Sequence, residues 1–244
     1  MASLDYRARI YDHYVHARTT SLAPATLSGF TSQEPYLLKV IREHFPRDRD
    51  ADILDLGCGH GVLIYFARRA GYSRIVGVDR SPEQVAEARR LEIDGVREGD
   101  LMATLEELPD ASQDAIIAFD VIEHFTREEL LPLVDEVRRV LKPGGKWLIH
   151  TPNGESPFFG RIRYGDMTHE QAFTATSMGQ LLLSSGFQSL YCYEDTPVVH
   201  GLMSAFRYSI WIVLRGMLRF YLAAETGQAH GAILTQNFLI VGVR

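Results

Sequence analysis

Apolar and polar residues follow two periodic patterns along this chain. Between residues 52 and 150, short apolar runs alternate with longer stretches in which apolar positions recur every three or four residues. The short runs predict buried strands, and the longer stretches predict amphipathic helices. The expected strands are 52–56, 74–78, 95–98, 114–119, 146–150, 187–193 and 237–243. The expected helices are 3–18, 32–45, 62–70, 81–91, 127–141, 177–185 and 198–224.

The alternation of strands and helices predicts an α/β fold with a doubly wound, mostly parallel seven-stranded sheet and helices on both faces. We expect one domain over residues 1–244, with residues 1–31 forming a helix and a mobile segment. Right-handed crossovers place ligands at the carboxyl ends of the strands. Residues 52–150 therefore form the expected ligand-binding core, while 152–176 and 196–236 are expected insertions that form a substrate cap.

Composition narrows the class of protein. With 244 residues, 46% hydrophobic residues and a net charge of −6, the chain fits a globular protein and argues against a nucleic-acid partner. It has 2 cysteines, which favours a reducing compartment over a disulfide framework. The first residues lack the apolar stretch of a signal peptide, and no charge-free apolar run approaches the ~20 residues that span a bilayer. We therefore expect a cytoplasmic protein.

A glycine-rich loop follows the first core strand. Residues 55–61 read D-L-G-C-G-H-G. Val62 occupies the position of the third glycine of the dinucleotide fingerprint, and the G-K-[ST] of a phosphate loop is absent. The carboxylate of Asp55 beside the loop would repel a pyrophosphate and attract an ammonium or sulfonium cation. The loop therefore predicts a nucleotide-like ligand that carries positive charge.

Acidic residues follow the next strands. Asp79 ends the second strand about 20 residues after the loop, where a carboxylate can accept hydrogen bonds from both ribose hydroxyls. Asp100 follows the third strand and can accept a hydrogen bond from an adenine amino group. Phe119 and Asp120 end the fourth strand and are expected to flank the same ligand.

Taken in order, these motifs resemble those of the class I S-adenosylmethionine-dependent methyltransferases. They are L-D-L-G-C-G-H-G, G-V-D, E-G-D-L, D-A-I-I-A-F-D-V-I-E-H and V-L-K-P-G-G. The resemblance implies a Rossmann-like fold and S-adenosylmethionine as the cofactor, with S-adenosylhomocysteine as the product. An ordinary strand, turn and helix without a ligand is the alternative. The implied cofactor-binding residues are Asp55, Gly57, Cys58, Gly59, Gly61, Asp79, Arg80, Asp100, Leu101, Phe119, Asp120 and Val121.

Methyl transfer to a hydroxyl needs a general base near the acceptor. His169 is the preferred candidate, with Asp166 or Glu170 orienting its imidazole. Glu123 and His124, just after the fourth strand, are further catalytic candidates, although His124 could instead cap the next helix. A structural role is expected for His150, which ends the fifth strand.

The stretch that contains His169 is dense in polar residues. Residues 153–174 read N-G-E-S-P-F-F-G-R-I-R-Y-G-D-M-T-H-E-Q-A-F-T, which resembles methyltransferases of bacterial polysaccharide and glycolipid pathways. This likeness implies a small-molecule acceptor with a sugar hydroxyl. The alternative is a solvated loop held by ion pairs. The expected acceptor-binding residues are Arg163, Tyr164, Asp166 and Glu170.

Other functions stay open at this point. Asp120, Glu123 and His124 resemble the acidic cluster that binds a divalent metal in ubiquinone-pathway O-methyltransferases, which would favour a quinone or phenol acceptor. We do not expect a bound metal. A non-catalytic module that binds S-adenosylmethionine is an alternative of another class. A nicotinamide-dependent reductase is disfavoured by Val62 and Asp55.

The expected helix at 198–224 is rich in aromatic residues and carries Arg207, Arg215 and Arg219. At helical spacing the three arginines fall within about 120° of one another. A helix of this kind can lie on a membrane surface. It can equally pack on the sheet as a cap or form the seam of a homodimer.

Overall fold

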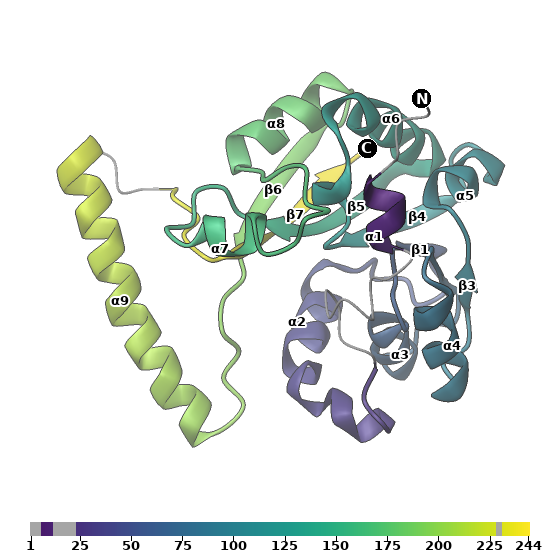
Figure 1. The fold of residues 1–244 in the computed structure, drawn as a ribbon, viewed down its shortest axis with the longest axis horizontal. Coiled ribbons are helices and arrows are strands. Elements are labelled where there is room, and N and C mark those ends of the chain that lie inside the picture. The colour runs from purple at the N-terminus through teal and green to yellow at the C-terminus, as the bar shows by residue number, and fades with distance from the viewer. Residues whose placement is uncertain (1–5, 12–22, 228–230) are drawn as a thin grey trace.

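The computed structural model describes residues 6–11, 23–227 and 231–244, and its centre is a seven-stranded sheet (Figure 1). The strand order is β3-β2-β1-β4-β5-β7-β6, and β7 is antiparallel to both of its neighbours. This confirms the predicted Rossmann-like, mostly parallel sheet. The strands are β1 (Ile53–Leu56), β2 (Ile75–Asp79), β3 (Val96–Glu98), β4 (Gln113–Phe119), β5 (Leu141–Pro152), β6 (Ser189–Glu194) and β7 (Asn237–Val243).

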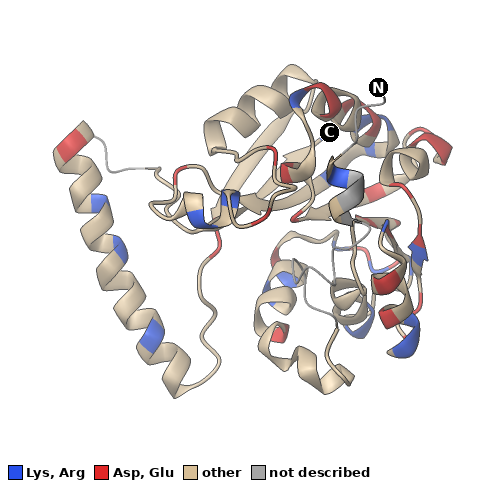
Figure 2. Ribbon diagram, viewed as in Figure 1, with Lys and Arg blue, Asp and Glu red and all other residues tan. Residues whose placement is uncertain are grey.

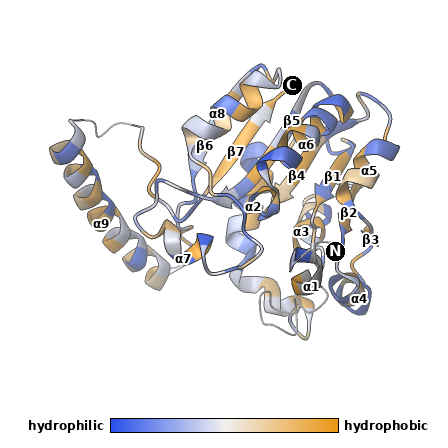
Figure 3. Ribbon diagram, turned by 45° about the horizontal axis from the view of Figure 1, so that its top comes forward, coloured by the Kyte–Doolittle hydropathy of each residue, from blue (hydrophilic) through white to orange (hydrophobic). Residues whose placement is uncertain are grey.

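Helices cover both faces of the sheet, which explains why its central strands are apolar throughout (Figure 3). In β4, Ile116 and Ala118 join the core cluster under α6 and α8, while Ala115 and Ile117 join the cluster under α2 and α3. The helices and 3₁₀ turns are α1 (Tyr6–Tyr11), η1 (Leu27–Ser32), α2 (Glu34–His44), α3 (Val62–Arg69), α4 (Pro82–Arg90), α5 (Leu101–Glu107), η2 (Ile122–His124), α6 (Arg127–Val140), α7 (Phe159–Arg163), α8 (Ala175–Ser184) and α9 (Leu202–Thr226).

Capping residues set the helix starts. Ser81 accepts a hydrogen bond from the amide of Gln84 at the start of α4, and Thr126 forms a capping box with Glu129 at the start of α6. Helix α5 was not expected, because its seven residues are too few to show a clear period. Asp100 caps it, so the acidic residue after β3 also begins a helix.

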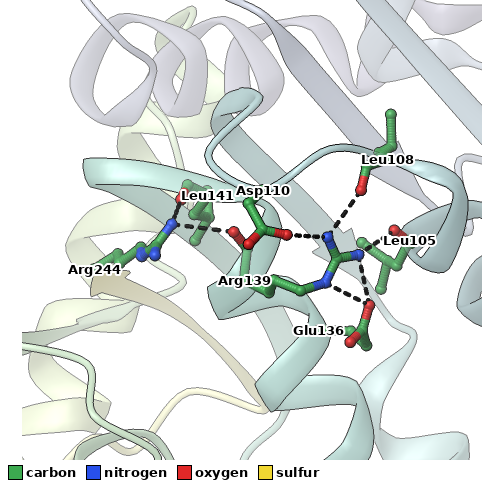
Figure 4. A network of polar contacts seen from close by, with 7 residues as sticks. All are labelled: Leu105, Leu108, Asp110, Glu136, Arg139, Leu141 and Arg244. Atoms are coloured by element: carbon green, nitrogen blue, oxygen red, sulfur yellow. Dashed lines mark hydrogen bonds and ion pairs between the residues drawn. The ribbon is translucent and has the colours of Figure 1, made fainter.

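Arg139 of α6 joins three parts of the fold (Figure 4). Its guanidinium donates to the carbonyls of Leu105 and Leu108, at 2.8 and 2.9 Å, and pairs with Asp110 at 2.6 Å. Arg244, after β7, donates to the carbonyl of Arg139 at 3.1 Å. These bonds hold the end of α5 and the end of β7 against α6.

The parts outside the core differ in detail from the expected elements. The N-terminal helix covers Tyr6–Tyr11 within the expected 3–18, and residues 12–22 lie outside the described part of the chain. The first insertion contains the short helix α7. The late helix begins at Leu202, four residues after the expected start, and ends before Gly227, whose φ of 73° closes it.

Helix α9 projects from the body of the molecule (Figures 1 and 3). Among the described residues, none of the helices is both long enough and apolar enough to cross a membrane.

Candidate cofactor and acceptor site

The glycine loop after β1 adopts the backbone conformation that its glycines permit. Gly57, Gly59 and Gly61 all have positive φ, at 67°, 56° and 81°. The amide of Gly57 donates to the carbonyl of Val78 at 2.8 Å, and the amide of Gly59 donates to Oδ2 of Asp79 at 2.7 Å. The loop and the end of β2 therefore form one hydrogen-bonded unit.

Asp55 gives this site its charge preference. Its side chain is 2% exposed, and the loss of hydration, followed by the nearby charge of Asp79, raises its pKa to about 8. Burial also raises the pKa of Asp79, although amide donors from Gly59 and Ser81 oppose the shift. A cation placed beside these carboxylates would stabilise their charged forms. The two carboxylates therefore suit the ammonium and sulfonium groups of S-adenosylmethionine, and Asp55 and Asp79 are the residues that would lie beside it.

An aromatic contact covers the glycine loop. Phe30 of η1 is fully buried and stacks on the ring of His60, with centroids 5.3 Å apart and an interplanar angle of 8°. Nδ1 of His60 lies 3.1 Å from Oε1 of Gln84 on α4. Sequence reasoning missed Phe30 and Gln84, because both lie outside the motif and reach the loop only through the fold.

The ends of β3 and β4 complete the expected cofactor site. Oδ1 of Asp100 accepts hydrogen bonds from the amides of Met102 and Ala103, so this oxygen is committed to the start of α5. Val121 fills the space next to Gly57, where an added Cβ would lie 2.5 Å from its Cγ2.

The expected cofactor residues are thus gathered at the carboxyl ends of β1, β2, β3 and β4, as predicted for a doubly wound sheet. Cys58 is an exception in its side chain, because an added Cβ on Gly77 would lie 2.6 Å from the Cys58 thiol. Burial raises the pKa of this thiol, so it stays protonated at neutral pH.

His150, at the carboxyl end of β5, lies between two carboxylates. Its Nδ1 is 2.8 Å from Oδ1 of Asp120, and its Nε2 is 3.4 Å from Oδ2 of Asp195. Burial lowers the pKa of His150, but the two aspartates outweigh that effect and raise it to about 10. The imidazole is therefore protonated at neutral pH and is not available as a general base.

A second cluster lies after β4. The ligand atoms of Glu123, His124 and His169 are within 4.8 Å of one another. Glu123 is 1% exposed, and its Oε2 accepts a hydrogen bond from Thr151 at 3.0 Å. Its Oε1 has no hydrogen-bond partner among the described residues. Loss of hydration, followed by repulsion from Asp120, raises the pKa of Glu123 well above its usual range.

His124 is oriented by the first insertion. The hydroxyl of Thr168 donates to Oδ1 of Asp166 at 2.7 Å and lies 2.9 Å from Nδ1 of His124. Nδ1 therefore carries the proton in this arrangement. Burial, and then repulsion from His169, lower the pKa of His124 to about 4. The cap of α6 is Thr126, so the expectation that His124 could cap this helix is wrong.

His169 faces the same cluster from the insertion. Its ring centroid lies 4.8 Å from that of His124, in an edge-to-face arrangement. Nδ1 of His169 lies 3.1 Å from the carbonyl oxygen of Ile162, which makes it the proton-bearing nitrogen. Asp166 or Glu170 was expected to orient this imidazole, whereas the contact described at Nδ1 is with a backbone carbonyl of α7.

The expected acceptor-binding residues differ in how far contacts within the protein hold their side chains. Arg163 donates to the backbone carbonyls of His169 and Glu170, so it fixes the loop. Asp166 and Glu170 are also bonded within the protein. Tyr164, in contrast, is 73% exposed.

Helix α1 contacts the segments that carry the cluster. Arg7 donates to both carboxylate oxygens of Glu129, at 2.8 and 2.7 Å, and to the carbonyl of His124 at 3.2 Å. Tyr6 donates to Glu170. The charge-assisted bonds from Arg7 lower the pKa of Glu129 to about 2. No motif marks these N-terminal residues, so the sequence alone did not reveal their role.

Comparison of the sequence with known proteins shows which family it resembles. Residues 53–145 match the family described as a methyltransferase domain. A protein of Mycolicibacterium smegmatis named as a probable S-adenosylmethionine-dependent methyltransferase is 36% identical over 155 residues, which covers 62% of this chain and 56% of the relative. A ubiquinone biosynthesis O-methyltransferase of Chelativorans sp. is 33% identical over 128 residues, covering 48% of this chain and 49% of the relative.

A solved structure shares the fold. The crystal structure of an S-adenosylmethionine-dependent methyltransferase from Archaeoglobus fulgidus superposes with a TM-score of 0.66 at 19% identity, covering 86% of this chain and 94% of the other. This likeness concerns the fold alone. The chain spans about half the length of the curated relatives it matches.

The matched segment is therefore a class I S-adenosylmethionine-dependent methyltransferase domain, an enzyme class whose cofactor is S-adenosylmethionine.

Proposed function

We propose that the protein methylates a hydroxyl group of a small molecule, on a sugar or on a glycolipid or polysaccharide precursor. Support comes from the cluster of Glu123, His124 and His169, which lies directly after β4 and beside the expected cofactor residues. The cofactor supplies a methyl group on a cationic sulfur, which makes that methyl strongly electrophilic. The protein's task is then to hold the acceptor oxygen in line and to accept its proton.

His169 is the proposed general base. Because its Nδ1 donates to the carbonyl of Ile162, its lone pair lies on Nε2, on the edge of the ring where a hydroxyl could donate. His124 is less suited, since its pKa of about 4 makes it a weak base. Arg163 holds the backbone around His169. The residues that we propose to surround the acceptor are Tyr164, Asp166 and Glu170.

Labelled cofactor incubated with cell extract, followed by mass spectrometry of the labelled product, tests the proposed reaction. Replacing the base, His169→Ala, should lower single-turnover rates by roughly 10²-fold or more while cofactor affinity stays within about twofold. His44→Ala, on α2 and outside the cluster, is the matched control. A His169→Ala variant with the rate of the natural protein would eliminate this base.

A metal-assisted O-methyltransferase for a quinone or phenol is the second candidate. The same three side chains offer one carboxylate and two imidazoles within 4.8 Å, and a relative of this chain is named for ubiquinone biosynthesis. Such a set suits a divalent ion. Titration calorimetry with magnesium and manganese tests binding directly. Loss of activity with a chelator and its recovery with metal would favour this function over the first.

A non-catalytic module that binds S-adenosylmethionine is the candidate of another class. It would bind the cofactor yet methylate no member of a broad acceptor panel. We propose a cytoplasmic location, supported by the free thiols of Cys58 and Cys192.

A further inference from the structure

Helix α9 presents two different faces. One face is turned toward the body: Ser204 is buried, and Arg215 forms an ion pair with Glu194 of β6. Trp211 and Arg207 line a cavity of about 380 Å³ between α9, the segment before it, and α2. The inner face of α9 is therefore occupied by contacts with the rest of the chain.

The opposite face is apolar and exposed. At about 100° per residue, its side chains fall within roughly 80° of one another and run along most of the helix. Their exposed fractions range from 45% to 94%. No charged residue lies within this strip, which we call the outer stripe. It consists of Leu202, Phe206, Ile210, Val213, Met217 and Phe220.

The charges on the rest of the helix indicate what covers the outer stripe. The helix carries Arg207, Arg215 and Arg219 and has no acidic residue before Glu225, although the whole chain has a net charge of −6 (Figure 2). Arg207 and Arg219 are exposed. A helix with an apolar strip on one side and exposed arginines toward its other side matches the interface of an anionic bilayer, where acyl chains meet negative head groups. Spanning is excluded for α9, because no described helix meets the length and hydropathy that spanning needs.

We infer that α9 lies in the surface of an anionic membrane, with its outer stripe in the acyl boundary and the exposed Arg207 and Arg219 at the head groups. The inner face of the same helix would then hold the cavity beside the bilayer. Tyr36 and Asp195 also line this cavity, and Asp195 contacts His150 at the carboxyl end of β5. If the proposed function holds, the acceptor is an amphiphile whose apolar part stays at the membrane surface beside α9.

Flotation with vesicles tests the membrane contact without catalysis. The full chain should bind vesicles of phosphatidylcholine with phosphatidylglycerol and should bind phosphatidylcholine alone far more weakly. The double variant Phe206→Asp/Phe220→Asp should weaken binding to the anionic vesicles by at least ~10-fold, since it removes apolar contact and adds negative charge. Leu131→Asp, on α6 and 52% exposed, is the matched control and should bind as the natural protein does.

Sedimentation velocity tests whether a second copy of the chain, instead of a membrane, covers the outer stripe. A dimer that dissociates in the same double variant, without vesicle binding, would overturn the inference in favour of a second copy of the chain. Equal binding by the natural protein and the double variant would overturn it as well. Calorimetry with S-adenosylmethionine shows that each variant is folded. Vesicle binding without any methyl transfer would leave the membrane contact standing and refute the proposed function.

Discussion

Two contacts between His150 and Asp120 join the carboxyl ends of β5 and β4. Nδ1 of His150 lies 2.8 Å from Oδ1 of Asp120, and the amide of Asp120 donates to the carbonyl of His150 at 2.9 Å. Asp120 has a φ of 55°, a left-handed conformation that few residues other than glycine adopt. The paired contacts hold this strained backbone at the carboxyl ends of β4 and β5.

The pair predicts a loss of stability at alkaline pH. An ordinary histidine titrates near 6.5, whereas His150 in the folded protein titrates at about 10. A raised folded pKa contributes stability that is complete below pH 6.5 and is lost as the pH rises through about 10. We expect the free energy of unfolding to fall by on the order of a few kcal/mol across that window. Urea unfolding at several pH values measures it. The same slope in His150→Gln would refute this assignment.

Cofactor affinity is predicted to rise with pH. Asp55 titrates at about 8 in the folded protein, so at neutral pH part of the population is uncharged. A bound cation favours the carboxylate, so binding should release protons and tighten between pH 6 and 8, by up to roughly tenfold per pH unit. Calorimetry in buffers of different ionisation enthalpy counts those protons. Asp55→Asn should bind weakly and without this dependence, whereas Asp94→Asn, on the exposed surface, should behave as the natural protein does.

The sequence predicted where the expected cofactor residues lie in the fold better than it predicted the contacts around them. The loop from Asp55 to Gly61 and the acid Asp79 follow strands directly, so strand order alone brings them together. The contacts of Phe30 with His60 and of Asp195 with His150 join segments far apart in the chain, and no local period reports such pairs. Helix α5 was missed for a related reason, since it is short and begins from an acid expected to bind ligand.

Arg7 is predicted to contribute to the stability of the fold at acidic pH. Glu129 titrates near 2 in the folded protein, below an ordinary glutamate at 4.5, because Arg7 donates to it. A depressed folded pKa contributes stability that is present above pH 4.5 and is lost as the pH falls through about 2. The pair is partly exposed, so we expect less than about 1 kcal/mol. Arg7→Ala should flatten this acid limb in thermal unfolding. The neighbouring Arg127→Ala should retain it, and an equal effect in both variants would contradict the pairing.

Gly57 is predicted to be irreplaceable for two separable reasons. Its φ is 67°, and an added Cβ would lie 2.5 Å from Cγ2 of Val121. Gly144 has a φ of 77° and open space around it, so a substitution there measures the cost of the backbone conformation alone. We expect Gly144→Ala to lower the free energy of unfolding by about 1 kcal/mol, and Gly57→Ala to lower it by roughly 2–4 kcal/mol.

The double variant Gly57→Ala/Val121→Ala measures the cost of the steric contact between the added methyl group and Val121. Removing the Val121 methyl groups should recover part of the loss caused by the methyl group added in Gly57→Ala, after allowance for the effect of Val121→Ala alone. Because the backbone strain persists, cofactor affinity should stay below that of the natural protein. Urea unfolding and calorimetry on the four variants measure both quantities. Equal losses in Gly57→Ala and Gly144→Ala would show that the Val121 contact yields without resistance, leaving conformation as the sole reason for glycine at this position.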